Sequence, residues 1–182
     1  MLQFRIQSTP NPNARKYIVN HDLKAAGKVS YQEVDQCQHV SMAAQLLASP
    51  GVSQVHFFEN VLTVTQDGSW DWGSLDKMVQ QTVASLIDSH DPHFIDHPDK
   101  VREPRNLSPE LEKIEEILDR TVRAALQADG GDIETVELVS NLLTVRYLGA
   151  CGSCPSSMSA TLDAIRSVLR DEYSEDLEIV AV

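Results

Sequence analysis

A proline-rich stretch between residues 89 and 109 is the feature that most constrains how this chain folds. It reads SHDPHFIDHPDKVREPRNLSP, with four prolines and clustered charges but no apolar period. Such a segment interrupts helices and central strands. The chain has 182 residues, enough for two small domains. We therefore expect a first domain over residues 1–88, a linker over 89–106 and a second domain over 107–182.

The second predicted domain, residues 107–182, shows the clearer pattern of secondary structure. A cap at Ser108 and the apolar stripe after it predict a helix. This helix is expected to end at Gly130 and Gly131, which both allow a left-handed turn. The runs IETVELV and LLTVRYL predict a β-hairpin. A helix that starts near Pro155 and a short strand, LEIVAV, would complete the domain.

The first segment also alternates between strand-like and helix-like runs. The runs FRIQS and RKYIVN predict two strands around the turn TPNPNA. A helix over 41–48, a hairpin VSQVHFFEN/VLTVTQ and an amphipathic helix over 74–87 follow. The predicted fold class is therefore α+β, with two small domains, each a mostly antiparallel sheet packed with helices.

Charge and composition exclude several classes of function. The net charge is −12 and no cluster of Lys and Arg offsets it, which argues against a nucleic-acid partner. No apolar run reaches the roughly 18 residues of a membrane-spanning helix. The N-terminal residues lack the apolar core of a signal peptide, and three cysteines do not form a disulfide framework. We therefore expect a cytoplasmic protein without a membrane partner.

The chemistry is concentrated in the loop LGACGSCPSS, residues 148–157, which contains Cys151 and Cys154. The loop is expected between a strand and the start of a helix, where the helix dipole lowers the pKa of a thiol. Two flanking glycines, Gly149 and Gly152, would let backbone N–H groups approach sulfur. The sequence thus indicates a site that favours the thiolate form.

Three interpretations of this cysteine pair are open. The first is two ordinary core cysteines, although a loop of Gly, Ser and Pro is an unusual place for them. The second is a dithiol redox motif, but the residues after Cys154 leave no room for the rest of a thioredoxin fold. The third is a metal site shared by two chains, because a closed thiolate site takes about four ligands. Iron–sulfur clusters and zinc both accept four thiolates, so spacing alone does not separate them.

Two longer segments resemble a known family. The segment ADGGDIETVEL, continued by LLTVRYLGACGSCPSS, resembles the C-terminal domain of the NifU family, the Nfu-type iron–sulfur scaffold and carrier proteins. Its most specific parts are the DGGD turn at 129–132 and the G-x-C-x-x-C-P-S-S loop at 149–157. The segment STPNPNARKYIVN, residues 8–20, resembles the separate Nfu N-terminal domain. The two resemblances cover most of the chain outside the linker.

The resemblance implies a function and a set of ligands. Nfu-type proteins bind a 4Fe–4S cluster, usually bridged between two subunits, and transfer it to apo-proteins. Carried over to this sequence, the ligands are Cys151 and Cys154, the cluster-bound form is a homodimer, and the chain is not an enzyme. Upstream cluster-assembly proteins would be the donors and apo iron–sulfur proteins the acceptors, while we assign partner recognition to the first domain. The alternatives are a 2Fe–2S cluster, a structural zinc dimer and a dithiol redox protein.

Other conspicuous residues receive structural interpretations. Cys37 is interpreted as a partly buried structural cysteine. Trp70 and Trp72 are expected to cap a small core beside a helix start. The histidines that alternate with aspartates between residues 90 and 97 are interpreted as part of a solvated linker rather than as a metal site. Asp129 and Asp132 are assigned turn and cap roles around the two glycines.

Overall fold

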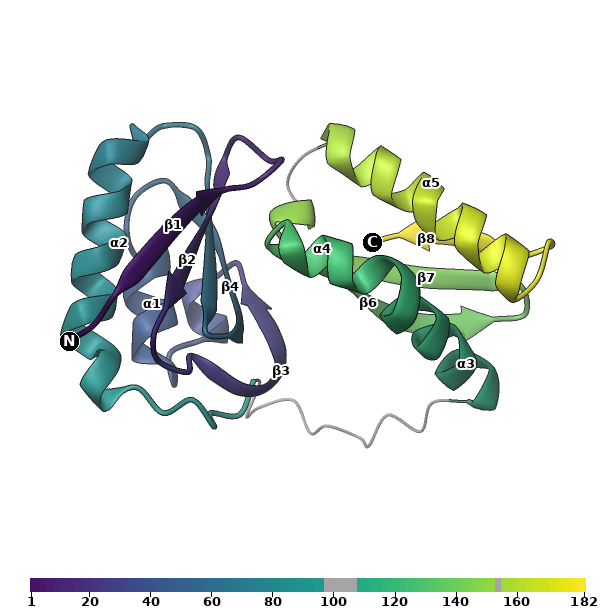
Figure 1. Cartoon of the computed structure of the whole chain (residues 1–182), viewed down its shortest axis with the longest axis horizontal. Coiled ribbons are helices and arrows are strands. Elements are labelled where there is room, and N and C mark those ends of the chain that lie inside the picture. Colours follow the sequence, from purple (N-terminus) through teal and green to yellow (C-terminus); the bar gives the residue numbers. More distant parts are fainter. Residues whose placement is uncertain (97–107, 153–154) are drawn as a thin grey trace. The chain divides into compact units, whose positions relative to one another are not determined.

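The computed structural model describes residues 1–96, 108–152 and 155–182. The chain divides into two compact units, Met1–Val101 and Arg102–Val182. Each unit has its own hydrophobic core and its own sheet (Figure 1). Helices and mostly antiparallel strands occur in both units, so the predicted α+β class is confirmed.

The first unit is an antiparallel five-stranded sheet with helices on one face (Figure 1). Its strand order is β1-β2-β5-β4-β3. The strands are β1 (Phe4–Ser8), β2 (Ala14–Val19), β3 (Lys24–Tyr31), β4 (Val52–Glu59) and β5 (Val61–Gln66). The helices are α1 (Ser41–Leu47) and α2 (Trp72–Leu86), with short 3-10 turns η1 (Val34–Gln36) and η2 (Ile87–Ser89). Tyr17, Phe57 and Leu62 are fully buried in the core between the sheet and the helices.

The TPNPN segment forms a hydrogen-bonded turn between β1 and β2. The hydroxyl of Thr9 donates to the carbonyl of Asn11 at 2.9 Å, and the Asn13 amide donates to the Asn11 side chain at 2.9 Å. The indole N–H of Trp72 donates to the carbonyl of Pro12 at 3.1 Å, which ties the turn to the start of α2. Trp70 and Trp72 both pack against the core, as the predicted capping role requires.

One strand of this sheet was not predicted from the sequence. β3 contains Ala25, Ala26 and Gly27, residues with low β propensity. Its register with β4 shifts between Lys24 and Lys28, and Gly27 has φ +73° within this irregular part. Pairing with β4 therefore determines the strand, and local propensity does not.

Residues 90–96, which composition places in the linker, contact the first unit. The ammonium of Lys24 lies 2.9 Å from the carboxylate of Asp96 and donates to the carbonyl of Phe94 at 3.0 Å. Tyr31 donates its hydroxyl proton to the backbone carbonyl of Asp96 at 2.6 Å. His90 is held 2.8 Å from the carbonyl of Leu23. The rest of the expected linker, residues 97–106, lies outside the described residues.

The second unit is a three-stranded sheet with helices on one face (Figure 1). Its helical part begins with α3 (Pro109–Leu118), the π-helical η3 (Asp119–Arg123) and α4 (Ala124–Ala128). The hairpin of β6 (Gly131–Val139) and β7 (Leu142–Gly149) follows, then η4 (Ala150–Gly152), α5 (Pro155–Glu172) and β8 (Glu178–Ala181). β7 is the central strand, antiparallel to β6 and parallel to β8. The predicted order of helix, hairpin, helix and strand is confirmed.

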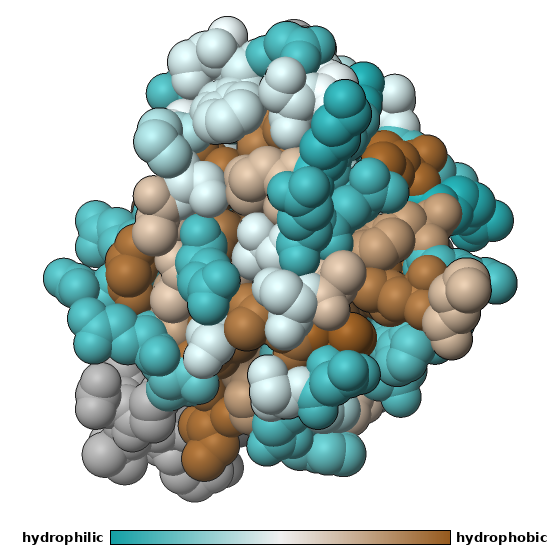
Figure 2. Space-filling view, turned by 90° about the vertical axis from the view of Figure 1, so that its left-hand side faces the viewer, coloured by the Kyte–Doolittle hydropathy of each residue, from teal (hydrophilic) through white to brown (hydrophobic). Residues whose placement is uncertain are grey.

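The described residues contain no membrane-spanning helix. No helix in that part of the chain is long and apolar enough to cross a bilayer. Figure 2 shows the side of the molecule on which α2 lies, where apolar residues are interspersed with hydrophilic ones. Such scattered apolar residues are normal on a protein surface.

Candidate cluster-binding loop of the second unit

The CxxC loop begins at the open end of the β6–β7 hairpin, beside the end of α4. Gly149, the last residue of β7, pairs with Gly131, the first residue of β6, and has φ +61°. The amide of Ala150 donates to the carbonyl of Gly130 at 3.1 Å. The chain then enters the 3-10 turn η4, which carries Cys151. The DGGD segment and the first cysteine are therefore direct neighbours in space.

The two sides of the loop are joined by a hydrogen bond between β7 and α5. Tyr147, which is largely buried in the core, donates its hydroxyl proton to the carbonyl of Met158 at 2.8 Å. This contact ties the end of the strand to the first turn of the helix. The second cysteine, Cys154, lies outside the described residues, directly before Pro155 in the sequence.

The Cys151 side chain lies in the hydrophobic core of the second unit. The residue is only 5% exposed and belongs to the same buried cluster as Ile133 and Tyr147. Burial, together with the smaller effect of the charges of Asp129 and Asp132, raises the pKa of its thiol to about 11. The thiol form of Cys151 is therefore favoured in this arrangement.

This finding corrects the expectation that the loop lowers the pKa of both thiols. Cys151 lies on η4 rather than at the first residue of α5, and its side chain points into the core. Loss of hydration then outweighs any effect of the helix dipole, because desolvation disfavours the charged form. For Cys154, which directly precedes the helix in sequence, a lowered pKa remains a prediction.

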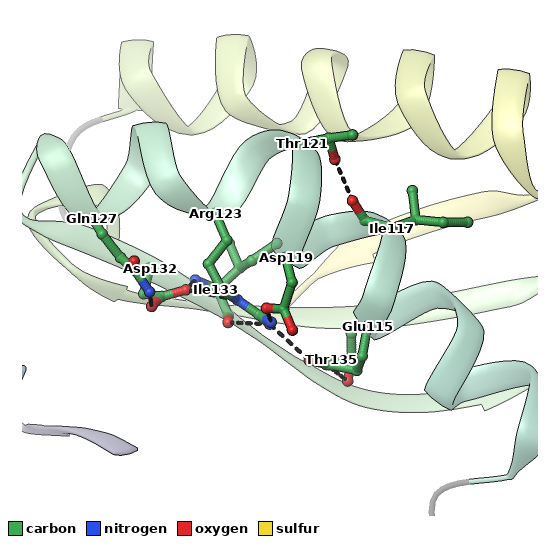
Figure 3. A network of polar contacts seen from close by, with 9 residues as sticks. All are labelled: Glu115, Ile117, Asp119, Thr121, Arg123, Gln127, Asp132, Ile133 and Thr135. Carbon is green, nitrogen blue, oxygen red and sulfur yellow. Dashed lines mark hydrogen bonds and ion pairs between the residues drawn. The ribbon is translucent and has the colours of Figure 1, made fainter. Parts of the chain in front are cut away.

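Beside this loop, the guanidinium of Arg123 links the helical layer to the edge of the sheet (Figure 3). It lies 3.2 Å from the Asp132 carboxylate and 2.9 Å from the Glu115 carboxylate, and it also pairs with Asp119. It further donates to the carbonyl of Ile133 at 3.2 Å. Burial alone lowers the pKa of Arg123, but the hydrogen bond to Asp119 and the charges of Glu115 and Asp132 raise it above the ordinary value. The guanidinium is therefore charged at neutral pH.

Asp132 has a different role from the turn or cap predicted for it. Its side chain is fully buried, and it accepts hydrogen bonds from the amide of Ile133 at 2.7 Å and from Gln127 at 2.9 Å (Figure 3). Together with Arg123 it forms a buried ion pair next to Gly131. The sequence signal for this pair is an arginine on the predicted helix, followed nine residues later by an aspartate near the start of a predicted strand.

The described residues alone do not assemble a metal site. Within 1–96, 108–152 and 155–182, no group of three or more His, Cys, Asp or Glu side chains has the geometry to hold a metal ion. Cys37 is fully buried in the core of the first unit, where its sulfur contacts the carbonyls of Glu33 and Val34. The structural role predicted for Cys37 agrees with this position.

Comparison with known proteins identifies both units. The profile of the NifU-like domain matches residues 114–180, in the second unit. The profile described as "Scaffold protein Nfu/NifU N terminal" matches residues 4–90, in the first unit. These matches define a two-domain protein whose second domain is NifU-like.

The chain consists of a member of the Nfu N-terminal domain family followed by a member of the NifU-like domain family. It is 28% identical over 93% of its length to the mitochondrial NifU-like protein 4 of Arabidopsis thaliana, and it covers 62% of that protein. It is 26% identical over 90% of its length to the human mitochondrial NFU1 iron-sulfur cluster scaffold homolog, and it covers 65% of that protein. The chain thus spans about three fifths of the length of these curated relatives. The human relative is named as a scaffold, which agrees with the expectation that the chain is not an enzyme.

A solved structure gives a weaker match. The solution structure of a NifU-like protein from Saccharomyces cerevisiae is 18% identical, with a TM-score of 0.45. The aligned region covers 55% of this chain and 87% of the yeast chain.

The comparison corrects the predicted location. The relatives from plants, flies and humans are named as mitochondrial proteins, which contradicts the expectation of a cytoplasmic protein. The cysteine content and the N-terminal residues, on which that expectation was based, do not distinguish the cytosol from an organelle.

Proposed function

We propose that this chain is a scaffold and carrier that holds an iron–sulfur cluster and passes it to apo-proteins. The observation that carries the proposal is the CxxC loop of a NifU-like domain, placed between the end of β7 and the start of α5. Relatives named as iron-sulfur cluster scaffolds support the same assignment. The cluster is cargo in this function, and the protein performs no turnover of a small molecule.

The proposed ligands are Cys151 and Cys154, with two chains needed to complete the site. A tetrahedral-sulfur cluster takes four thiolates, and the loop of one chain supplies two. Cys37 is buried in the core of the first unit and cannot serve as a third ligand without unfolding part of that core. A symmetric homodimer that brings two loops together supplies the required four. We assign a 4Fe–4S cluster to this bridged site.

Transfer would then proceed by ligand exchange. A thiolate of the acceptor binds an iron atom as the bond from that iron to Cys151 or Cys154 breaks, so the number of sulfur ligands is conserved. The leaving thiolate takes a proton from solvent, and neither iron nor sulfur changes its oxidation state. Opening of the dimer releases the remaining ligands, which suits a carrier better than a permanent electron-transfer centre.

Upstream cluster-assembly proteins would load the carrier, and apo iron–sulfur proteins would receive the cluster. We assign recognition of these partners to the first unit. That unit has a separate core and contains no cysteine besides the buried Cys37, so it offers no ligand for the cluster. Its contribution to a carrier is then a surface for protein partners.

Anaerobic reconstitution with iron and sulfide tests the proposed function. We expect a brown dimer with about four iron and four sulfide per two chains. Cys151→Ala and Cys154→Ala should each abolish cluster binding, while Cys37→Ala, the matched control, should retain it. A colourless dimer with one zinc would favour a structural zinc site, and a monomer with an accessible disulfide would favour a dithiol oxidoreductase. Either result would overturn the carrier assignment.

A further inference from the structure

Gly131 lies so close to Cys151 that a residue with a side chain would not fit at position 131 unless its neighbours shifted. A Cβ atom on residue 131 would lie 2.3 Å from the Cys151 sulfur, 2.9 Å from its backbone nitrogen and 3.0 Å from its Cβ. Real Cβ atoms essentially never approach other heavy atoms within 3.0 Å, as the first two of these contacts would require. Rotation of the cysteine side chain would relieve the first contact but not the contact with the backbone nitrogen. A side chain at residue 131 would therefore move the turn that carries Cys151.

The backbone of Gly131 does not itself require glycine. The neighbouring Gly130 has φ +80° and supplies the left-handed turn after α4, whereas Gly131 is a strand residue paired with Gly149. The sequence predicts the same turn role for both glycines, but the structure gives them different roles. The space occupied by Cys151 accounts for a glycine at 131.

We infer that Gly131 forms a seat for the Cys151 sulfur in the cluster-free protein, and that Cys151 leaves this seat to ligate a cluster. With 5% of the residue exposed, the sulfur is packed among core side chains and is not accessible to iron shared with a second subunit. The first half of the inference depends on the geometry alone. The second half rests on the proposed ligand role of Cys151.

A seat of this kind gives the ligand two positions with different purposes. In the seated position the sulfur is sheltered from oxidants and from unwanted metals. In the outward position the sulfur can bind iron, but this position is the less populated one in the cluster-free protein. The apparent affinity for the cluster is lowered by the fraction of molecules in the outward position. Return of Cys151 to its seat would also favour release of the cluster to an acceptor.

Alkylation of the cluster-free full-length chain with iodoacetamide, followed by peptide mass spectrometry, tests the seat. This readout follows each cysteine separately, so no cysteine needs to be replaced. We expect Cys151 in the folded chain to react at least about 100-fold more slowly than in the urea-unfolded chain. Gly131→Ala should accelerate the reaction of Cys151 at least about tenfold and leave that of Cys37 unchanged. Equal rates for Cys151 in the parent and the Gly131→Ala chain would overturn the inference.

Two control variants separate the seat from general effects. Gly73→Ala adds a methyl group to a helix where the nearest atom, on the flexible Asp71 side chain, lies at 3.4 Å, and it should leave Cys151 protected. Ile165→Ala creates a cavity in the same core at a residue of α5, so it reports the effect of lost stability. The two variants are compared at the same free energy of unfolding. If Ile165→Ala then accelerated the alkylation of Cys151 as much as Gly131→Ala, a specific seat would be refuted.

Reconstitution of the same variants tests the movement of the ligand. Gly131→Ala should bind iron and sulfide in the same ratio as the parent chain and release the cluster to a chelator a few-fold more slowly. A folded Gly131→Ala protein that cannot bind the cluster would show that Gly131 is needed in the loaded state, and it would overturn the two-position inference. If instead Cys151→Ala bound a full cluster, the proposed ligand set would fail, while the alkylation result would still decide whether the seat exists.

Discussion

Arg123→Met is the substitution whose effect the structure specifies most closely. Methionine keeps much of the aliphatic stem and removes the guanidinium. The fully buried carboxylate of Asp132 then loses its charged partner, although it keeps hydrogen bonds from Ile133 and Gln127. Removal of one partner from a buried ion pair costs about 3–5 kcal/mol. Because two hydrogen bonds to Asp132 remain, we expect a loss near the lower end, about 3 kcal/mol.

Most of this loss comes from Asp132 rather than from the other two carboxylates. The side chain of Asp119 is 61% exposed and that of Glu115 is 21% exposed, so water compensates much of what they lose. Ion pairs at such positions contribute at most about 1 kcal/mol. A double-mutant cycle with Asp132→Asn isolates the main pair, because the neutral amide no longer needs a cation. The double variant should therefore be more stable than Arg123→Met alone.

Urea unfolding followed by two probes measures the effect in the full chain. Both tryptophans, Trp70 and Trp72, are in the first unit, so their fluorescence reports that unit alone. Far-ultraviolet circular dichroism reports both units. With an m-value of about 1 kcal/mol/M for a unit of this size, a loss of about 3 kcal/mol lowers the urea midpoint of the second unit by about 3 M. The midpoint from fluorescence should not move.

Arg146→Met is the matched control. Arg146 is half-exposed and lies 3.5 Å from the Glu134 carboxylate, so its removal should cost less than about 1 kcal/mol. If Arg123→Met shifted the midpoint no more than Arg146→Met, the buried ion pair would not be a major source of stability. A double variant with Asp132→Asn that is no more stable than Arg123→Met would refute the reasoning about the unpaired carboxylate.

Three further predictions concern the first unit. Lys24→Met removes the ammonium that faces the buried Asp96, so the fluorescence-detected unfolding free energy should fall by about 3 kcal/mol; a change below about 1 kcal/mol would contradict this. Burial raises the pKa of the Cys37 thiol from 9.0 to about 11, so the unfolded chain ionises first and stability falls as pH rises from 9 towards 11. Cys37→Ala should make this fall shallower in urea titrations at several pH values, and an unchanged slope would rule out the contribution. Because each unit has its own core, residues 102–182 alone should bind a cluster but transfer it to an apo-acceptor more slowly than the full chain. Equal transfer rates would contradict the recognition role of the first unit.

The sequence was informative wherever one local pattern determines an element. The hairpin of β6 and β7 has strongly β-prone runs on both sides of a short turn, and the helix that begins at α3 has a cap at Ser108 and a regular apolar stripe. The strand β3 lacked such a pattern, because its pairing with β4 comes from residues far away in the chain. Residues 90–96 were assigned to the linker by composition, yet the ion pair of Lys24 and Asp96 fixes them on the first unit.

The cysteine loop shows the same limit at the candidate site. The spacing of Cys151 and Cys154 and the surrounding glycines could be recognised in the sequence. The burial of Cys151 could not, because it depends on how closely the first residue of β6 approaches the turn after β7. The π-helical segment before α4 had no recognisable signal either, and it carries Arg123. Both features depend on contacts between elements, which a one-dimensional pattern does not encode.

The buried ion pair and the proposed seat occupy consecutive residues, so they should be coupled. Asp132 is held by Arg123, and Gly131, the residue before it, contacts Cys151. Loss of the guanidinium should loosen the start of β6 and with it the shelter of the thiol, although Arg123 and Cys151 share no contact among those described. Arg123→Met should therefore accelerate alkylation of Cys151 more than Ile165→Ala does at equal free energy of unfolding. If the two variants exposed Cys151 equally, the network would stabilise the unit as a whole without positioning the ligand.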